Sequence, residues 1–341
     1  MTKVAEGQSG ATISDVAERA GVSIRTVSRV LNKSPKVNSE TRERIEEAIA
    51  QLHFRPSPRA RALAMGRSFL IGMVHNDRNA LVLDAFQRGI VQEAAPRGYE
   101  LIVHSTPVDE GGVDDVLAFI DRSRVDGLIL LPPVSGIADL PRALEQANVP
   151  AVALSSLPIT GYRAVILARE REAAAEVARY LLGLGHRRIA LVNGPKGTVS
   201  AQERRAGFVD ALGRAGVEMA GEAHGDYGFH SGVRAAEQLL TLDPPPSAIF
   251  AANDEMAAGV LKVAATRGIA VPGALSVVGF DGSLLSEMLT PALTSVARPF
   301  TQMTGEATRQ LIDRIEGKPG SDPAEMPLRL IEAESSGPAP R

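Results

Sequence analysis

The chain contains no cysteine among its 341 residues. This absence excludes disulfide bonds, thiolate metal sites and thiol nucleophiles, which leaves metal binding or catalysis to six scattered histidines and the carboxylates. Aromatic residues make up only 4% of the sequence, against 44% hydrophobic and 23% charged residues. This composition is typical of a soluble globular protein, and the length predicts two or three domains.

Long apolar runs are also missing. No run approaches the roughly 18 residues that a membrane-spanning helix needs. The first fifteen residues, MTKVAEGQSGATISD, lack the apolar core of an export signal. We therefore expect a cytoplasmic protein with no membrane partner.

Motifs of catalysis are scarce as well. The segment GPKGT at 194–198 lacks the G-x-x-x-x-G-K-[ST] spacing of a phosphate-binding loop, and no G-x-S-x-G turn occurs. His224 and His230 lie near Asp226, but no third metal ligand stands at a suitable spacing. The sequence predicts no enzyme, no metal and no cofactor.

Charge is distributed unevenly along the chain. Residues 1–67 contain 12 Lys and Arg against 7 Asp and Glu, whereas the remainder contains 25 against 33. No acidic residue occurs between Glu47 and Asp77, a gap that includes four arginines. A basic front part on an acidic body suggests that a polyanion binds at one end, although charge alone fits a solvated basic surface equally well.

The basic front part predicts three short helices. A capping pattern at Thr12–Asp15 starts the first, and Gly21 ends it. Ser23 precedes a second helix, IRTVSRVLN, and a third begins at Asn38 or Ser39. Two helices joined by AGVS form a helix-turn-helix, and the outward residues of the second helix are Ile24, Arg25, Ser28 and Arg29. At that helix end side chains come within reach of DNA base edges.

From Phe69 onward, apolar strand runs alternate with amphipathic helices. The runs FLIGMV, YELIVHS, VDGLILL and VPAVAL form one set, and RRIALVN, SAIFAAN and LSVVGF form a second. Such alternation indicates βαβ units with parallel sheets. The doubled rhythm predicts two similar lobes that bind a ligand in the cleft between them, at the carboxyl ends of their strands.

The segment from TISDVAERAGVSIRTVSRVLN to FLIGMV closely resembles the N-terminal region of the LacI/GalR family of bacterial transcription regulators. The resemblance continues through GHRRIALVNGP, RRAGF, FAANDEMAAGV, LSVVGFD and PALTSVARP, and so covers nearly the whole chain. It implies an α/β fold class in which an all-α helix-turn-helix headpiece precedes a two-lobed body like that of the periplasmic binding proteins.

The resemblance also implies domain boundaries. The DNA-binding domain spans 1–56, the hinge helix or linker 57–67, and the effector-binding and dimerisation domain 68–341. Within that domain the N-lobe is expected at about 68–163 plus 291–330, and the C-lobe at about 164–290.

By resemblance, the base-reading positions fall on Ile24, Arg25 and Arg29, and Leu63 is a wedge inserted into the minor groove. Serine and threonine near the helix ends suit phosphate contacts. The predicted DNA-binding residues are Thr12, Ser23, Ile24, Arg25, Thr26, Ser28, Arg29, Asn32, Arg59, Ala60 and Leu63. The alternative is a helical pair that packs onto its own body.

The resemblance assigns Arg204 as an effector clamp, Asn253 and Asp281 as strand-end hydroxyl binders, and Tyr227 as an aromatic that stacks on the ligand. The loop after the first strand, HNDRNALVLD, differs from many relatives and suggests a distinct ligand. The predicted effector-binding residues are His75, Asn76, Asp77, Arg204, Tyr227, Asn253 and Asp281. Two alternatives stay open: Arg204 as an interlobe salt bridge, and Asp281 as a helix cap.

The resemblance therefore implies a transcriptional regulator, namely a repressor, that binds pseudo-palindromic operator DNA under control of a small carbohydrate-like effector. Because the C-terminal segment has no leucine heptad, a homodimer is expected. The alternatives are a sugar-binding protein and an enzyme acting on a small polar metabolite. The sequence does not determine the effector, or whether it acts as inducer or corepressor.

Overall fold

The computed structural model describes residues 11–31, 34–54, 66–76, 79–108, 111–319 and 324–340. It divides into two units, Met1–Ser68 and Phe69–Arg341, which we call the headpiece and the body. The residues predicted to bind DNA or effector that lie outside the described ranges are Asn32, Arg59, Ala60, Leu63 and Asp77. Most of the predicted hinge also lies outside them.

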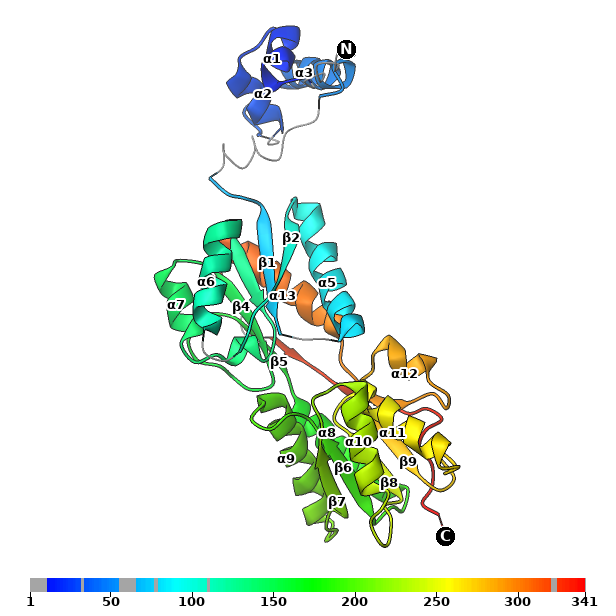
Figure 1. Ribbon diagram of the computed structural model, residues 1–341. Coiled ribbons are helices and arrows are strands. Elements are labelled where there is room, and N and C mark those ends of the chain that lie inside the picture. The colour runs from blue at the N-terminus through cyan, green and yellow to red at the C-terminus, as the bar shows by residue number, and fades with distance from the viewer. Residues whose placement is uncertain are drawn as a thin grey trace, which may run out of the picture. The chain divides into compact units, whose positions relative to one another are not determined.

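The headpiece contains the three predicted helices, α1 (Ile13–Ala20), α2 (Ile24–Leu31) and α3 (Ser39–Gln51) (Figure 1). Each contributes apolar side chains to one small core. The buried members of that core are Val16, Ala17, Ala20, Val27, Val30, Ile45, Ala48 and Phe54. Because α2 buries only the side that carries Val27 and Val30, its opposite side is left for other contacts.

Local side chains fix the ends of these helices. Thr12 and Asp15 form a reciprocal capping box at the start of α1. Gly21 ends α1 with a φ of +63°, a left-handed conformation that glycine adopts without strain. The side chain of Asn38 accepts a hydrogen bond from the Thr41 amide at the start of α3.

The body contains two six-stranded sheets. The first has the order β11-β5-β4-β3-β1-β2 and is parallel throughout. Its strands are β1 (Leu70–His75), β2 (Glu100–Ser105), β3 (Gly127–Leu130), β4 (Ala151–Ser155), β5 (Val165–Ala168) and β11 (Ala324–Met326).

The second sheet has the order β12-β10-β9-β8-β6-β7. Its pairs are parallel except for the antiparallel pair of β10 with β12. Its strands are β6 (Ile189–Asn193), β7 (Gly221–His224), β8 (Ala248–Ala251), β9 (Ser276–Asp281), β10 (Thr294–Ala297) and β12 (Arg329–Ile331).

Helices flank both sheets (Figure 1). In the first lobe they are α5 (Ala80–Ala94), α6 (Gly112–Ser123), α7 (Leu140–Gln146) and α13 (Phe300–Ile315), with short 3-10 turns at Ala95–Arg97 and Val134–Gly136. In the second lobe they are α8 (Glu170–Gly183), α9 (Val199–Arg214), α10 (Phe229–Leu239), α11 (Asp254–Thr266) and α12 (Leu284–Met288). In the part of the chain that the structure describes, no helix is both long and apolar enough to cross a bilayer.

The chain passes between the lobes at three described places, from β5 to α8, from β10 to α13 and from β11 to β12 (Figure 1). These crossings correct the predicted lobe boundaries. β5 lies in the first sheet although it was expected in the C-lobe, and β10 and β12 lie in the second sheet although they were expected in the N-lobe. The error arises because these strands contain only three or four residues, too few to show a period.

Candidate functional site

The exposed side of α2 is the candidate DNA-binding surface. Ile24 is 50% exposed, which is unusual for a large apolar side chain, and Arg25 beside it is also exposed. The Ser23 hydroxyl accepts a hydrogen bond from the Thr26 amide and lies 2.8 Å from the Thr26 hydroxyl. The first turn of α2 is therefore held in place while its outward side chains face solvent.

The other described members of the predicted DNA-binding set are Thr12, Ser28 and Arg29. Ser28 and Arg29 are half-buried on α2. The Thr12 hydroxyl and amide both donate to the carboxylate of Asp15, and these hydrogen bonds lower the pKa of Asp15. Thr12 thus has a structural role as the N-cap of α1.

The second lobe contains an ion network of two arginines and two carboxylates. It lies near two of the places where the chain passes between the lobes. Arg204 Nε donates to Glu170 Oε2 over 2.9 Å, and Arg298 Nη2 lies 3.2 Å from Glu170 Oε1. Arg298 Nη1 donates to Asp281 Oδ1 over 3.2 Å, and Arg204 Nη2 lies 3.9 Å from the same oxygen. Glu170 begins α8 directly after one crossing, while Arg298 lies within another. The network therefore joins two of the three places where the chain changes lobe.

The surroundings of Arg204 hold its guanidinium in one position. The group packs 3.9 Å from the ring centre of Phe280 and donates to the carbonyl of Ala252. Burial lowers the pKa of Arg204, but the charges of Glu170 and Asp281 outweigh that effect and raise it. For Glu170, burial raises the pKa, and the charges of Arg204 and Arg298 overcome it, so that the carboxylate is ionised.

Asn253 and Asp254 follow β8 and begin α11. The Asn253 side chain accepts from the Met256 amide and donates to the carbonyl of Tyr227, so it both caps α11 and holds the loop before α10. Tyr227 has a φ of +69°, and its ring packs so closely on Gly194 that a Cβ there would lie 2.4 Å from it. Asn253 thereby fixes the position of the aromatic ring.

Asp254 is fully buried and accepts three hydrogen bonds. Its Oδ2 accepts from the amide and hydroxyl of Ser283, and its Oδ1 accepts from the hydroxyl of Ser295 over 2.5 Å. Burial, and then the nearby charge of Asp281, raise the pKa of Asp254 to about 7. This carboxyl links α11 to the ends of β9 and β10.

His75 and Asn76 stand at the carboxyl end of β1 in the first lobe. His75 is buried, whereas Asn76 is exposed and donates to the carbonyl of Thr106. Ser156 of the first lobe meets Ser200 of α9 with their hydroxyl oxygens 3.2 Å apart, a described contact between the lobes. The strand ends of both lobes thus carry polar groups.

Sequence reasoning missed three members of this site. Glu170 falls in the run AREREAAAE, which is typical of a solvated helix face, and Asp254 is typical of an acidic first helical turn. Arg298 follows a strand that was not predicted.

The sequence left open an interlobe salt bridge as the role of Arg204. Its observed partners, Glu170 and Asp281, both lie in the second lobe, as Arg204 itself does, so these two ion pairs are within one lobe. Asp281 ends β9 and pairs with Arg298, and the N-cap of the following helix, α12, is Ser283.

The arrangement suits a small polar ligand. Within the described ranges no group of three His, Cys, Asp or Glu could hold a metal ion. Forked guanidinium donors beside carboxylate acceptors match the hydroxyl or carboxyl groups of a small polar molecule.

Together the two units define a class, that of two-lobed ligand-binding proteins that carry a helix-turn-helix. Comparison with known proteins agrees with this, because residues 12–57 match the family "Bacterial regulatory proteins, lacI family", and residues 178–336 match the family "Periplasmic binding protein-like domain". The chain is 34% identical to the HTH-type transcriptional repressor PurR of Erwinia tasmaniensis, over 97% of this chain and 98% of the relative. The chain belongs to the LacI family of bacterial regulatory proteins, and the resemblance seen in the sequence is confirmed.

Two solved structures extend the comparison. The lac repressor dimer bound to operator and the anti-inducer ONPF matches with a TM-score of 0.81 and 31% identity, over 96% of this chain and all of that one. The complex of the transcriptional regulator CelR with cellobiose matches with a TM-score of 0.71 and 30% identity, over 95% of this chain and 99% of that one. Both similarities span headpiece and body.

Glu170→Gln tests the ion network. Removing this buried charge leaves Arg204 and Arg298 without their shared carboxylate, and we expect the free energy of unfolding to fall by about 3–5 kcal/mol in chemical denaturation. Glu172→Gln is the matched control, because Glu172 is exposed and pairs with exposed Arg169. That change should cost less than about 1 kcal/mol. Equal losses in the two variants would contradict the network.

Asp254→Asn tests the buried carboxyl. Because the folded state raises the pKa of Asp254 from 3.8 to about 7, its contribution to stability is largest below pH 4 and is lost as the pH rises toward 7. The wild-type protein should therefore lose stability relative to the variant by about 1 kcal/mol per pH unit between pH 5 and pH 7. A difference in unfolding free energy that stays constant across this range would refute the assignment.

Proposed function

We propose that the protein is a dimeric transcriptional repressor whose affinity for operator DNA is controlled by a small carbohydrate-like ligand bound between the lobes of the body. The observation that carries this proposal is the similarity of this chain, over 96% of its length, to a repressor crystallised as a dimer on its operator. A protein that binds operator DNA acts in the cytoplasm, where bacterial DNA lies. Its activity is binding rather than catalysis, as in the transcriptional regulators that it resembles.

The exposed start of α2 supports the DNA-binding half of the proposal. A helix of this kind enters the major groove with its N-terminal residues against the base edges. Arg25 is exposed there, and arginine reads guanine through two parallel hydrogen bonds. Ile24 offers an apolar contact, which suits the methyl group of thymine. Ser23, Thr26, Ser28 and Arg29 are proposed to contact the backbone or neighbouring bases.

The ion network supports the ligand-binding half. Arg204 and Asp281 project from α9 and the end of β9, and Asn253 and Tyr227 lie beside them. We propose that these four side chains bind the ligand from the second lobe, and that His75, Asn76 and Asp77 bind it from the first. Cellobiose in the CelR complex supports a sugar-like ligand.

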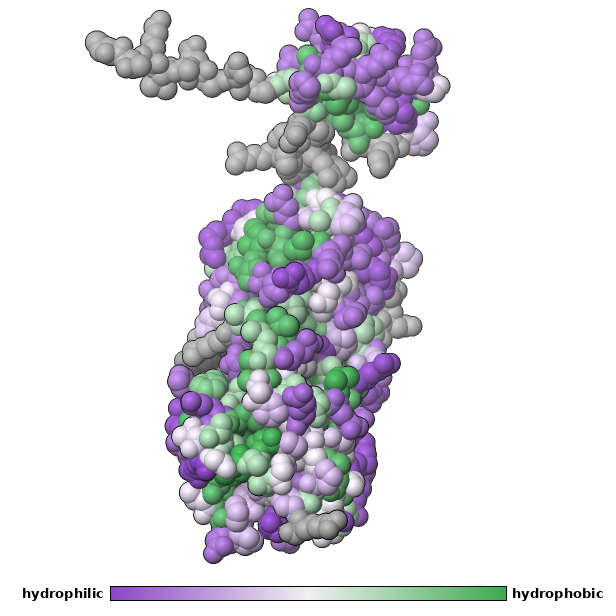
Figure 2. Space-filling model, turned by 90° about the vertical axis from the view of Figure 1, so that its right-hand side faces the viewer, coloured by the Kyte–Doolittle hydropathy of each residue, from purple (hydrophilic) through white to green (hydrophobic). Residues whose placement is uncertain are grey.

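Apolar surface supports the dimer. Val91 of α5 is 47% exposed, and Leu284 and Met288 of α12 are 58% and 67% exposed. Figure 2, a view onto the side of the body on which α5 and α12 lie in Figure 1, shows apolar patches among polar surface in both lobes. We propose that this side pairs with a second copy of the chain.

Arg25→Ala tests the role of α2. Purified protein is used to select binding sites from random duplex DNA, and we expect the wild type to enrich a two-half-site motif. The variant should lose the preference at one base pair of each half-site, worth about 1–3 kcal/mol, and keep the rest of the motif. Arg142→Ala, on α7 of the body, is the control and should select the wild-type motif. An unchanged motif with Arg25→Ala would contradict the base-reading role.

Arg204→Lys tests the ligand site. Sugars and sugar acids are screened for those that raise the melting temperature of the full chain. Lysine keeps the positive charge beside Glu170 but removes the forked donor, so we expect the ligand-induced shift to disappear in this variant. The control Glu172→Gln should retain it. A ligand whose shift survives both Arg204→Lys and Asp281→Asn binds elsewhere, and that result would refute the proposed site.

A further inference from the structure

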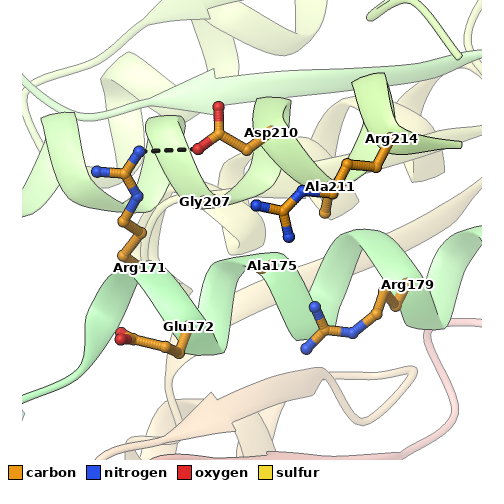
Figure 3. A pocket seen from close by; sticks show the side chains of 8 residues that line it. All are labelled: Arg171, Glu172, Ala175, Arg179, Gly207, Asp210, Ala211 and Arg214. Atoms are coloured by element: carbon orange, nitrogen blue, oxygen red, sulfur yellow. Dashed lines mark hydrogen bonds and ion pairs between the residues drawn. The ribbon is translucent and has the colours of Figure 1, made fainter. Parts of the chain in front are cut away.

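A groove runs between α8 and α9 on the second lobe, and none of the four residues of the ion network lines it. It has a volume of about 210 Å³ and is lined by Arg171, Glu172, Ala175, Arg179, Gly207, Asp210, Ala211 and Arg214 (Figure 3). Three of these eight residues are arginines. Neither the operator-binding surface nor the proposed ligand site uses any of them.

The floor of the groove is made of small residues. Gly207 lets the helices approach so closely that a Cβ built on it would lie 1.9 Å from the carbonyl oxygen of Arg171. Ala175 and Ala211 continue this floor toward the carboxyl ends of the helices. Because the floor side chains are short, the long arginines at the rim enclose a hollow. In Figure 3 Arg179 extends from α8 and Arg214 from α9, and the guanidinium group of Arg214 lies between the two helices.

The acidic residues of the groove already have partners. Asp210 Oδ2 accepts from Arg171 Nη2 over 2.8 Å, and Glu172 lies 3.1 Å from Arg169. By contrast, no described acidic group forms an ion pair with Arg179 or Arg214, although both are exposed. The groove therefore holds two arginine charges, one from each helix, that the described acidic groups leave available to a ligand.

We propose that this groove binds a phosphate-type oxyanion between Arg179 and Arg214. Two guanidinium groups balance the charge of a phosphate dianion and present planar, forked donors that match its oxygens. The hollow has room for a phosphate group, either inorganic phosphate or the phosphoryl group of a small metabolite. Binding would bridge α8 to α9 through Arg179 and Arg214. Since α8 begins at Glu170, the bridge would act on the helix that carries one end of the ion network.

Calorimetric titration of the full chain with inorganic phosphate, at constant ionic strength and with chloride as the reference anion, tests this. We expect saturable binding that weakens about 10-fold or more in Arg179→Gln and in Arg214→Gln, and disappears in the double variant. Both side chains are exposed, so the variants should fold, and circular dichroism checks this. Arg142→Gln, an exposed helical arginine of the other lobe, is the matched control and should bind as the wild type does.

A second titration with glycerol 2-phosphate identifies the source of the anion. Tighter binding of this ester than of phosphate, lost in the double variant, supports a phosphorylated metabolite, and equal binding supports phosphate itself. Absence of saturable binding of both compounds overturns the proposal. So does binding that survives in the double variant but is lost in Arg204→Lys, since that result would place the anion in the proposed ligand site. Failure here leaves the proposed repressor function untouched, because no step of that function uses the groove.

Discussion

The body depends on one electrostatic constraint, the pairing of two arginines with two carboxylates that are largely removed from water. Glu170 and Arg298 stand where the chain changes lobe, and Arg204 and Asp281 pair with them from within the second lobe. Charges removed from water are tolerated only when their partners are placed well, and loss of one partner is far more costly than loss of a surface pair. Contacts of about 3 Å hold Glu170, at the start of α8, to Arg204 and Arg298, and Arg298 to Asp281. The network therefore ties the start of α8 to the segment between β10 and α13, two of the segments that connect the lobes.

This constraint gives a physical route from ligand to DNA in the proposed function. A ligand that engages Arg204 or Asp281 competes with their contacts to Glu170 and Arg298, and those two residues belong to the crossings. A ligand shifts the balance between lobe placements only by the difference in its affinity for them. The sign of that difference decides whether the ligand releases the repressor or recruits it. Polar contacts such as Ser156 with Ser200 belong to one such placement.

Local signals made the headpiece predictable. Thr12, Gly21 and Asn38 are helix-end residues whose preferences act within one turn, so the sequence alone located all three helices. In the body, the longer apolar runs were predicted as strands, but β5, β7, β10, β11 and β12 were not. Each has at most four residues, and only the tertiary pairing identifies it. Arg204 and Asp281 were reached through the family resemblance. Glu170, Asp254 and Arg298 were not, because their burial is created by partners distant in the sequence.

The coupling between ligand and operator is the central claim, and it is measured most directly by titrating one selected operator fragment with the protein at increasing ligand concentration. We predict that the dissociation constant for the operator changes about 5- to 150-fold when the ligand saturates the body, and that operator DNA changes the affinity for the ligand by the same factor. An operator affinity that stays constant while the ligand saturates the body would contradict it.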